Sequence, residues 1–232
     1  MAAVMMAESS ALQDASAAPA GKQQASTKAG LALLLTAPVL MGFAFYVGLA
    51  MFGGALGNFS VSALGEMYED SSLRALGWVL SAYLIASPIG VLVGGYIADR
   101  IRRHDWLAAG CFVGIAVLVS MVAAFDLSLL VIGVVFAFAG LLNGIVAPSR
   151  DMLIRSMTPP GQMGKVFGFV STGFNVGGIV APLMFGYILD NGAPALVFWV
   201  AAGLALLTVP TVLITGSKGR RAASARARPA VS

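Results

Sequence analysis

The 232-residue chain has little charge and almost no cysteine or histidine. Asp, Glu, Lys and Arg together make up 10% of the residues, against about 25% in a typical soluble domain. One cysteine excludes a disulfide framework, and one cysteine with one histidine excludes an ordinary zinc site. Apolar residues account for 59% of the chain, and its mean hydropathy is +0.90. A soluble fold would need polar surface that this composition does not supply, so the sequence predicts an integral membrane protein.

Sequence motifs for enzyme chemistry are also missing. The chain has no phosphate-binding P-loop, no G-x-S-x-G, no H-E-x-x-H and no pair of carboxylates inside an apolar run. We therefore expect no enzyme activity, no cofactor and no metal. The net charge of +4 is better explained by membrane topology than by nucleic-acid binding.

Apolar runs without a charged residue occur six times at the length a spanning helix needs, about 20 residues. A single charge at the centre of such a helix costs about 2.5–3.5 kcal/mol, so uncharged runs should insert. The runs show no alternation of polar and apolar residues, which excludes barrel strands and leaves an all-α fold. The predicted spans are Gly30–Asn58, Leu76–Ala98, Trp106–Phe125, Leu127–Ala147, Val166–Leu189 and Ala195–Thr215.

Basic residues indicate the orientation of these six spans. Both termini and the loops after the second and fourth spans share one side, and thirteen Lys and Arg residues fall there. The opposite side has Arg74 as its only basic residue, beside five acidic ones. Short loops rich in Lys and Arg stay in the cytoplasm, so we expect both termini to be cytoplasmic.

Composition divides the chain into three parts. Residues 1–28 are rich in Ala, Ser and Gln and lack an apolar core, which predicts a disordered cytoplasmic leader instead of a signal peptide. Residues 29–216 form the six-helix bundle. Residues 217–232 are basic and contain a proline, which predicts a disordered cytoplasmic tail.

The loop after the second predicted span has the pattern G-x-x-x-D-R-x-x-R, formed by Gly95, Asp99, Arg100 and Arg103. This pattern resembles the signature loop of the major facilitator superfamily, which follows the second helix of each six-helix half. Arg102 stands where the family usually has a glycine, a departure more typical of the second half. Gly95, the first residue of the pattern, would let a neighbouring helix approach the end of the second span. The alternative is a generic basic turn of a membrane protein.

Later segments strengthen the resemblance. Residues 148–152, 164–169 and 173–182 are similar to the late helices of facilitator exporters of the fosmidomycin-resistance type. Four residues of the fifth span are small or helix-bending and are expected to allow close packing: Gly173, Gly177, Gly178 and Pro182. The resemblance covers about residues 30–215 and implies one half, the C-terminal one, of a twelve-helix transporter. A separately encoded half, a truncated copy and a misassigned start all remain open.

Polar residues inside spans are the candidate lining of a transport cavity, because an unpaired polar group in lipid is costly. The alternative for each of them is a helix-to-helix hydrogen bond, worth about 0.6 kcal/mol. In the facilitator fold the third and sixth helices of a half lie outside the cavity, and the third and sixth spans here are poor in polar residues. The candidates are Asn58, Tyr83, Asn143, Ser171 and Asn175.

The resemblance also implies a cytoplasmic latch, in which the Asp of the signature loop meets a basic helix end. We expect Asp99 to pair with Arg150, at the end of the fourth span. Removing one partner of a partly buried pair leaves the other charge uncompensated. Replacement of Asp99 by Asn should therefore impair folding or transport more than replacement of Asp105 by Asn.

These expectations favour a secondary transporter, or half of one, that moves a small solute by alternating access across a bacterial inner membrane, with proton-coupled export as one form of this function. Its partners would be the solute, the lipid bilayer and a second six-helix half or a second copy. The alternative is a non-transporting six-helix subunit, or a truncated relic, that pairs with another half.

Overall fold

The computed structural model describes residues 34–101, 103–158 and 161–226, and they are almost entirely helical. Six helical stretches are long and apolar enough to cross a membrane, which confirms the predicted all-α fold with six spans. The elements are α3 (Ala37–Gly54), η1 (Ala55–Phe59), α4 (Ser60–Met67), α5 (Leu73–Ala98), α6 (His104–Ala124), α7 (Leu129–Met157), α8 (Met163–Asp190) and α9 (Pro194–Arg226).

The first span differs from its predicted position. It consists of α3, η1 and α4 and covers Val39–Met67, whereas the sequence predicted Gly30–Asn58. No charged residue occurs from 29 to 65, so the apolar run is longer than a bilayer requires and charge alone does not fix where the helix begins. The helix continues through Asn58 by way of η1, a π-helical turn.

The C-terminal helix also differs from the prediction. The span itself ends at Ile214, but α9 continues to Arg226, through most of the stretch predicted as a disordered tail. Residues 220–226 are made of Arg, Ala and Ser, and Ala and Arg are among the best helix formers. The predicted leader, residues 1–28, lies outside the described residues, as do 29–33 and 227–232.

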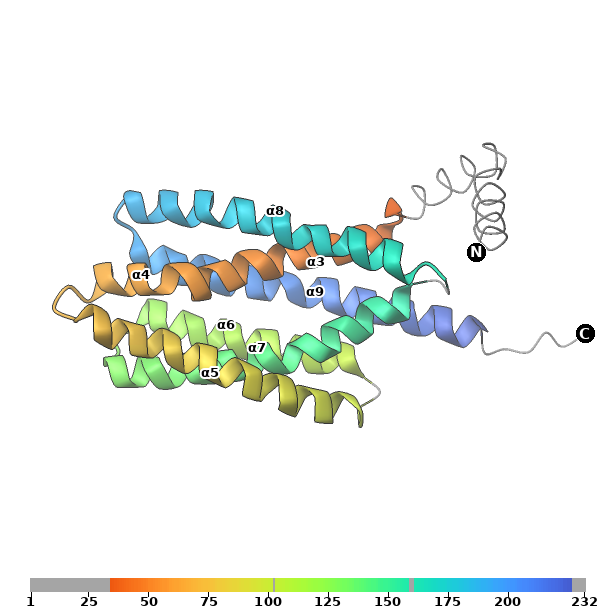
Figure 1. Cartoon of the computed structure of the whole chain (residues 1–232), viewed down its shortest axis with the longest axis horizontal. Helices are drawn as coiled ribbons and strands as arrows, with labels where there is room; N and C mark the ends of the chain where they lie inside the picture. Colours follow the sequence, from red (N-terminus) through yellow and green to blue (C-terminus); the bar gives the residue numbers. More distant parts are fainter. Residues whose placement is uncertain (1–33, 102, 159–160, 227–232) are drawn as a thin grey trace, which may run out of the picture. The chain divides into compact units, whose positions relative to one another are not determined.

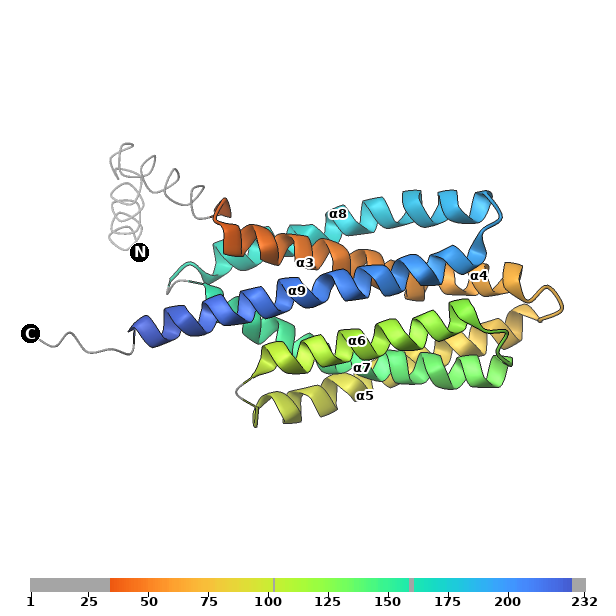
Figure 2. The ribbon, with the colours of Figure 1, turned by 180° about the vertical axis from the view of Figure 1, so that it is seen from behind.

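Within the unit that begins at Pro38, the helices run antiparallel and their loops gather at two ends (Figures 1 and 2). We call the end with the α5–α6 and α7–α8 loops the basic end, because Arg100, Arg103, Arg155 and Lys165 lie there. The other three loops form the acidic end. Its charged residues are Glu66, Glu69, Asp70, Arg74, Asp126 and Asp190.

Glycines bring α5 and α7 into close contact. A Cβ atom added to Gly94 of α5 would lie 2.7 Å from the Cα of Ile145, and one added to Gly144 of α7 would lie 2.7 Å from the backbone nitrogen of Val91. Gly90 and Gly140 meet the facing backbone just as closely. Real Cβ atoms are not found at such distances, so these four positions require glycine for the two helices to cross.

A second close crossing joins α3 and α8. A Cβ atom at Gly173 would lie 2.8 Å from the carbonyl oxygen of Phe43, and one at Gly177 would lie 2.6 Å from that of Val47. Next to this contact, the rings of Phe43 and Phe169 stack with their centroids 5.3 Å apart. Together the two crossings place α3 with α8 and α5 with α7, and the candidate site lies among these four helices.

Candidate functional site: a cavity among α3, α5, α7 and α8

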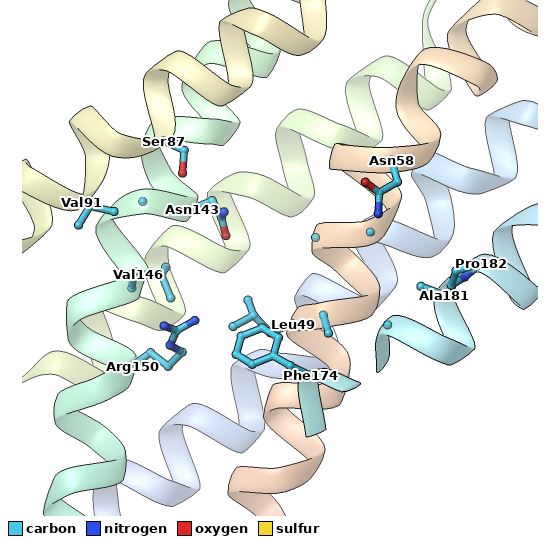
Figure 3. A pocket seen from close by; sticks show the side chains of 16 residues that line it. Leu49, Asn58, Ser87, Val91, Asn143, Val146, Arg150, Phe174, Ala181 and Pro182 are labelled. Carbon is cyan, nitrogen blue, oxygen red and sulfur yellow. The ribbon is translucent and has the colours of Figure 1, made fainter. Parts of the chain in front are cut away.

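A cavity of about 340 Å³ lies among α3, η1, α5, α7 and α8 (Figure 3). Neither α6 nor α9, the third and sixth spans, contributes a lining residue. This agrees with the arrangement that the sequence predicted for those two helices. The lining residues are Leu49, Ala50, Gly53, Gly54, Asn58, Ser87, Val91, Asn143, Gly144, Val146, Ala147, Arg150, Phe174, Gly178, Ala181 and Pro182.

Two asparagines occupy separate walls of the cavity. Asn58 belongs to η1, while Asn143 belongs to α7 and lies near Ser87 of α5 (Figure 3). The Nδ2 atom of Asn143 donates to the Tyr83 hydroxyl at 3.0 Å. This bond uses one donor of the Asn143 amide, and the amide oxygen retains its capacity to accept.

The five predicted cavity residues divide into two groups. Asn58 and Asn143 line the cavity, whereas Tyr83 is buried behind it and supports Asn143. Ser171 and Asn175 are not among the lining residues, and Asn175 is exposed. The sequence placed these two four apart on one face of the fifth span. Ser171 lies seven residues before Gly178 and Asn175 seven residues before Pro182, so both lie on the same side of α8 as these lining residues but nearer the basic end of the bundle.

The α8 wall lies on an overlapping side of that helix and reaches farther toward the acidic end of the bundle. Phe174, Gly178, Ala181 and Pro182 follow a spacing of three to four residues and all line the cavity. A Cβ atom at Gly178 would meet nothing within 4 Å. Gly178 therefore does not have the close-packing role that the sequence predicted for it. The two glycines that do pack tightly are Gly173 and Gly177, which face α3.

Arg150 is the cavity residue that the sequence placed elsewhere. Its Nε lies 2.9 Å from Oδ1 of Asp151, and the Tyr46 hydroxyl donates to the same oxygen at 3.4 Å. Its guanidinium carbon lies 5.2 Å from the ring centroid of Tyr46 and 5.5 Å from that of Phe174. Both distances are within the range of cation–π attraction. The guanidinium is thus held from α3, α7 and α8 together.

This arrangement corrects the predicted latch. The ion pair that Arg150 makes is with Asp151, and among the described residues it makes none with Asp99. Asp99 is exposed and ends α5, where its backbone N–H donates to the carbonyl oxygen of Gly95 at 3.1 Å. Asp151 follows Arg150 directly in the chain and on the same helix, so it reaches the guanidinium with no need for α5 to approach.

The other residues of the signature loop are also exposed or have no close neighbour from another described helix. Arg100 stacks over the ring of Tyr96 at 3.6 Å, and Arg103 is exposed. A Cβ atom at Gly95 would meet nothing within 4 Å. The close helix approach predicted at Gly95 occurs instead one and five residues earlier, at Gly94 and Gly90.

Comparison with known proteins identifies the family. Residues 38–231 match the sequence profile of the Major Facilitator Superfamily. The chain belongs to this family of membrane transporters. It is therefore a multi-pass membrane protein and not an enzyme, as the sequence predicted. The six described spans are its facilitator helices.

Curated relatives in the superfamily include drug exporters. The chain is 28% identical over 157 residues to the tetracenomycin C resistance and export protein of Streptomyces glaucescens, which covers 66% of the chain and 28% of that protein. It is 28% identical over 123 residues to the multidrug resistance efflux pump PmrA of Streptococcus pneumoniae. This alignment covers 53% of the chain and 30% of PmrA. The chain is 30% identical over 145 residues to the multidrug resistance protein MdtG of Yersinia enterocolitica, covering 62% of the chain and 34% of that protein.

These alignments span about a third of the length of each relative. The chain is therefore related to drug efflux transporters through one part of their length.

Proposed function

We propose that the chain is one six-helix half of an export transporter that moves small molecules by alternating access. The observation that carries this proposal is the cavity of about 340 Å³ within an otherwise apolar bundle, with Asn58, Asn143 and Arg150 on its walls. Pockets of this size with a few polar groups among apolar ones are typical of small-molecule sites. The relatedness to drug exporters supports export. We extend the proposal to the fosmidomycin-resistance type, on the segments 148–152, 164–169 and 173–182, and to a proton gradient as the energy source.

The proposal includes an orientation and a partner. We place both termini in the cytoplasm of a bacterial cell with the protein in the inner membrane, because the basic end of the bundle holds Arg100, Arg103, Arg155 and Lys165. The partner is a second six-helix half or a second copy, since facilitators rock two such bundles about a central site. The cytoplasmic latch has no support from Asp99, and we do not include it.

A second function is supported by one observation, the alignment of the chain with about a third of each relative. A bundle of this length would also suit a subunit that pairs with another half but does not transport, or a truncated relic. The two functions differ in what accompanies the chain. A partner half should have six spans and its own G-x-x-x-D-R loop, encoded next to this chain.

The first test is therefore to inspect the neighbouring coding sequence, and the second is transport. Everted membrane vesicles that contain both halves should accumulate tetracenomycin C when energised. Asn143→Ala should reduce this accumulation, whereas Asn191→Ala, a matched change at the exposed end of α8, should leave it unchanged. Equal accumulation in vesicles with and without the protein would support the non-transporting alternative. The lack of an adjacent half would favour a second copy of this chain as the partner, or a relic.

A further inference from the structure

The charge of the cavity comes from one residue. Arg150 is the single formally charged side chain among the lining residues, and the others are apolar, small or neutral polar. Its side chain is 20% exposed, so the guanidinium is partly removed from solvent but still accessible from the cavity. Figure 3 shows the Arg150 side chain extending from α7 toward the space beside Leu49 and Phe174.

The counter-charge lies outside the cavity. Asp151 is bonded to the Nε atom of Arg150, but it is not a lining residue, and its side chain is 52% exposed. Solvent around Asp151 weakens its field in the cavity, because an exposed charge is well screened. A molecule in the cavity therefore meets the guanidinium directly and the carboxylate only from behind.

We infer that this cavity selects small anionic molecules with an apolar or aromatic body, and that Arg150 is the residue that binds the anionic group. This inference rests on the proposed function and names the substrate class of the same site. The guanidinium fork has five donors, and a carboxylate or phosphate accepts two of them side by side. Bonding of Asp151 to Nε uses one edge of the fork and leaves the rest of its donors for a ligand.

The remaining walls suit the rest of such a molecule. Leu49, Val91, Phe174 and Pro182 offer apolar contact, and Phe174 offers a ring face for stacking. The Asn143 amide can bond a second polar group. A cationic molecule would meet the guanidinium at short range in an environment where charge repulsion is stronger than in water.

Three probes of nearly equal shape test this inference: 1-naphthoate, 1-naphthamide and 1-naphthylmethylammonium. Their dissociation constants are measured by equilibrium dialysis against the purified full chain in nanodiscs. Naphthoate should bind about tenfold more tightly than naphthamide, as a charge-assisted bond predicts, and the ammonium probe should bind most weakly. Equal affinities for the three probes, or no binding of naphthoate, would overturn the inference.

Variants assign the effect to Arg150. Arg150→Gln should remove the preference for naphthoate over naphthamide, and Arg150→Lys should retain part of it because the charge is kept. Arg155→Gln, on the exposed surface of the same helix, should keep the full preference, and Asp151→Asn should keep or increase it. Persistence of the preference in a folded Arg150→Gln protein contradicts the inference.

The same variants separate this inference from the proposed function. If tetracenomycin C transport occurs and naphthoate shows no preference, the function holds and the inferred substrate class is wrong. If Arg150-dependent naphthoate binding occurs and no transport is found with any partner half, the binding site stands and the transport proposal fails.

Discussion

Asp99 and Asp105 lie at the same end of the bundle but in opposite surroundings. The Asp99 side chain is exposed, whereas Asp105 is 1% exposed and belongs to the first turn of α6. The backbone N–H groups of a helix N-terminus stabilise a carboxylate, and removing a buried polar interaction costs about 1–3 kcal/mol. We therefore expect Asp105→Ala to lower the free energy of unfolding by about this amount and Asp99→Ala to leave it nearly unchanged.

The order of these two effects is the reverse of the one predicted from sequence. It can be measured through Cys111, which is the only cysteine of the chain and is buried. A maleimide dye that fluoresces on reaction with a thiol reports unfolding in detergent as this side chain becomes accessible. A lower midpoint temperature for Asp99→Ala than for Asp105→Ala would contradict the prediction and restore the latch.

Residue identities predicted the cavity in part. Asn58 and Asn143 were found because an amide within an apolar run is rare and costly. Arg150 was assigned to the wrong carboxylate, since charge pattern does not show which partner a long side chain reaches. Ser171 and Asn175 lie on the same side of α8 as the lining residues Gly178 and Pro182, but sequence periodicity does not show how far along the helix the cavity extends.

The crossing of α5 and α7 depends on individual glycines along each helix. At Gly144 a methyl group would lie 2.7 Å from the Val91 nitrogen, a backbone atom that cannot rotate away. We expect Gly144→Ala to lower the unfolding midpoint, at a cost of about 1–3 kcal/mol, the range for overpacking. Gly95→Ala is the matched control, because a Cβ atom there meets nothing within 4 Å and alanine favours the helix.

The same dye assay on Cys111 compares the two glycine variants with the unmodified protein. Equal midpoints for Gly144→Ala and Gly95→Ala would show that α5 and α7 separate at little cost.

The π-helical turn η1 positions Asn58 in the cavity wall. Such turns occur frequently at functional sites, and this one interrupts the first span beside the polar lining. Asn58→Ala should weaken binding of the naphthoate probe or transport of tetracenomycin C severalfold while leaving the unfolding midpoint unchanged. Ser62→Ala, an exposed position on α4, is the matched control. A loss of stability without a loss of binding would make Asn58 a packing residue.

Hydrophobic periodicity and charge located the elements well but not their ends. Six spans followed from six uncharged runs, because the cost of a buried charge leaves few alternatives. The first span was misplaced because its uncharged run, residues 29–65, is longer than the roughly 20 residues that a bilayer requires, so neither end of the helix is fixed by charge. The extension of α9 past Gly219 to Arg226 was missed because a basic composition was taken as disorder, although Ala and Arg favour a helix.

At the scale of the whole molecule, the arrangement of helices around the cavity was available mainly from the family resemblance. The scarcity of polar residues in the third and sixth spans is consistent with α6 and α9 lying away from the cavity, but composition does not pair α3 with α8. The sequence predicted close packing at glycines such as Gly173 and Gly177, but it did not show which helix would pack against them. The structure supplies those partners and shows that the cavity lies among the four helices that they join.

We propose that energy coupling requires more than this chain. Proton-driven transport needs a titratable group that reaches the cavity, and within the described residues every Asp and Glu lies near a helix end or in a loop. Asp151, which contacts Arg150, is the second-to-last residue of the span Leu129–Met152. The coupling acid should therefore belong to the partner half.

We expect the purified 232-residue chain, reconstituted alone in liposomes, to show no solute uptake driven by a pH gradient. Addition of a matching first half should restore uptake, because it would supply both the missing acid and the second bundle. Membrane insertion of the lone chain is checked in the same liposomes by protease protection of its basic end. Robust uptake by the lone chain that a protonophore abolishes would mean that Asp151 or another carboxylate of this chain carries the proton, and that two copies form the functional unit.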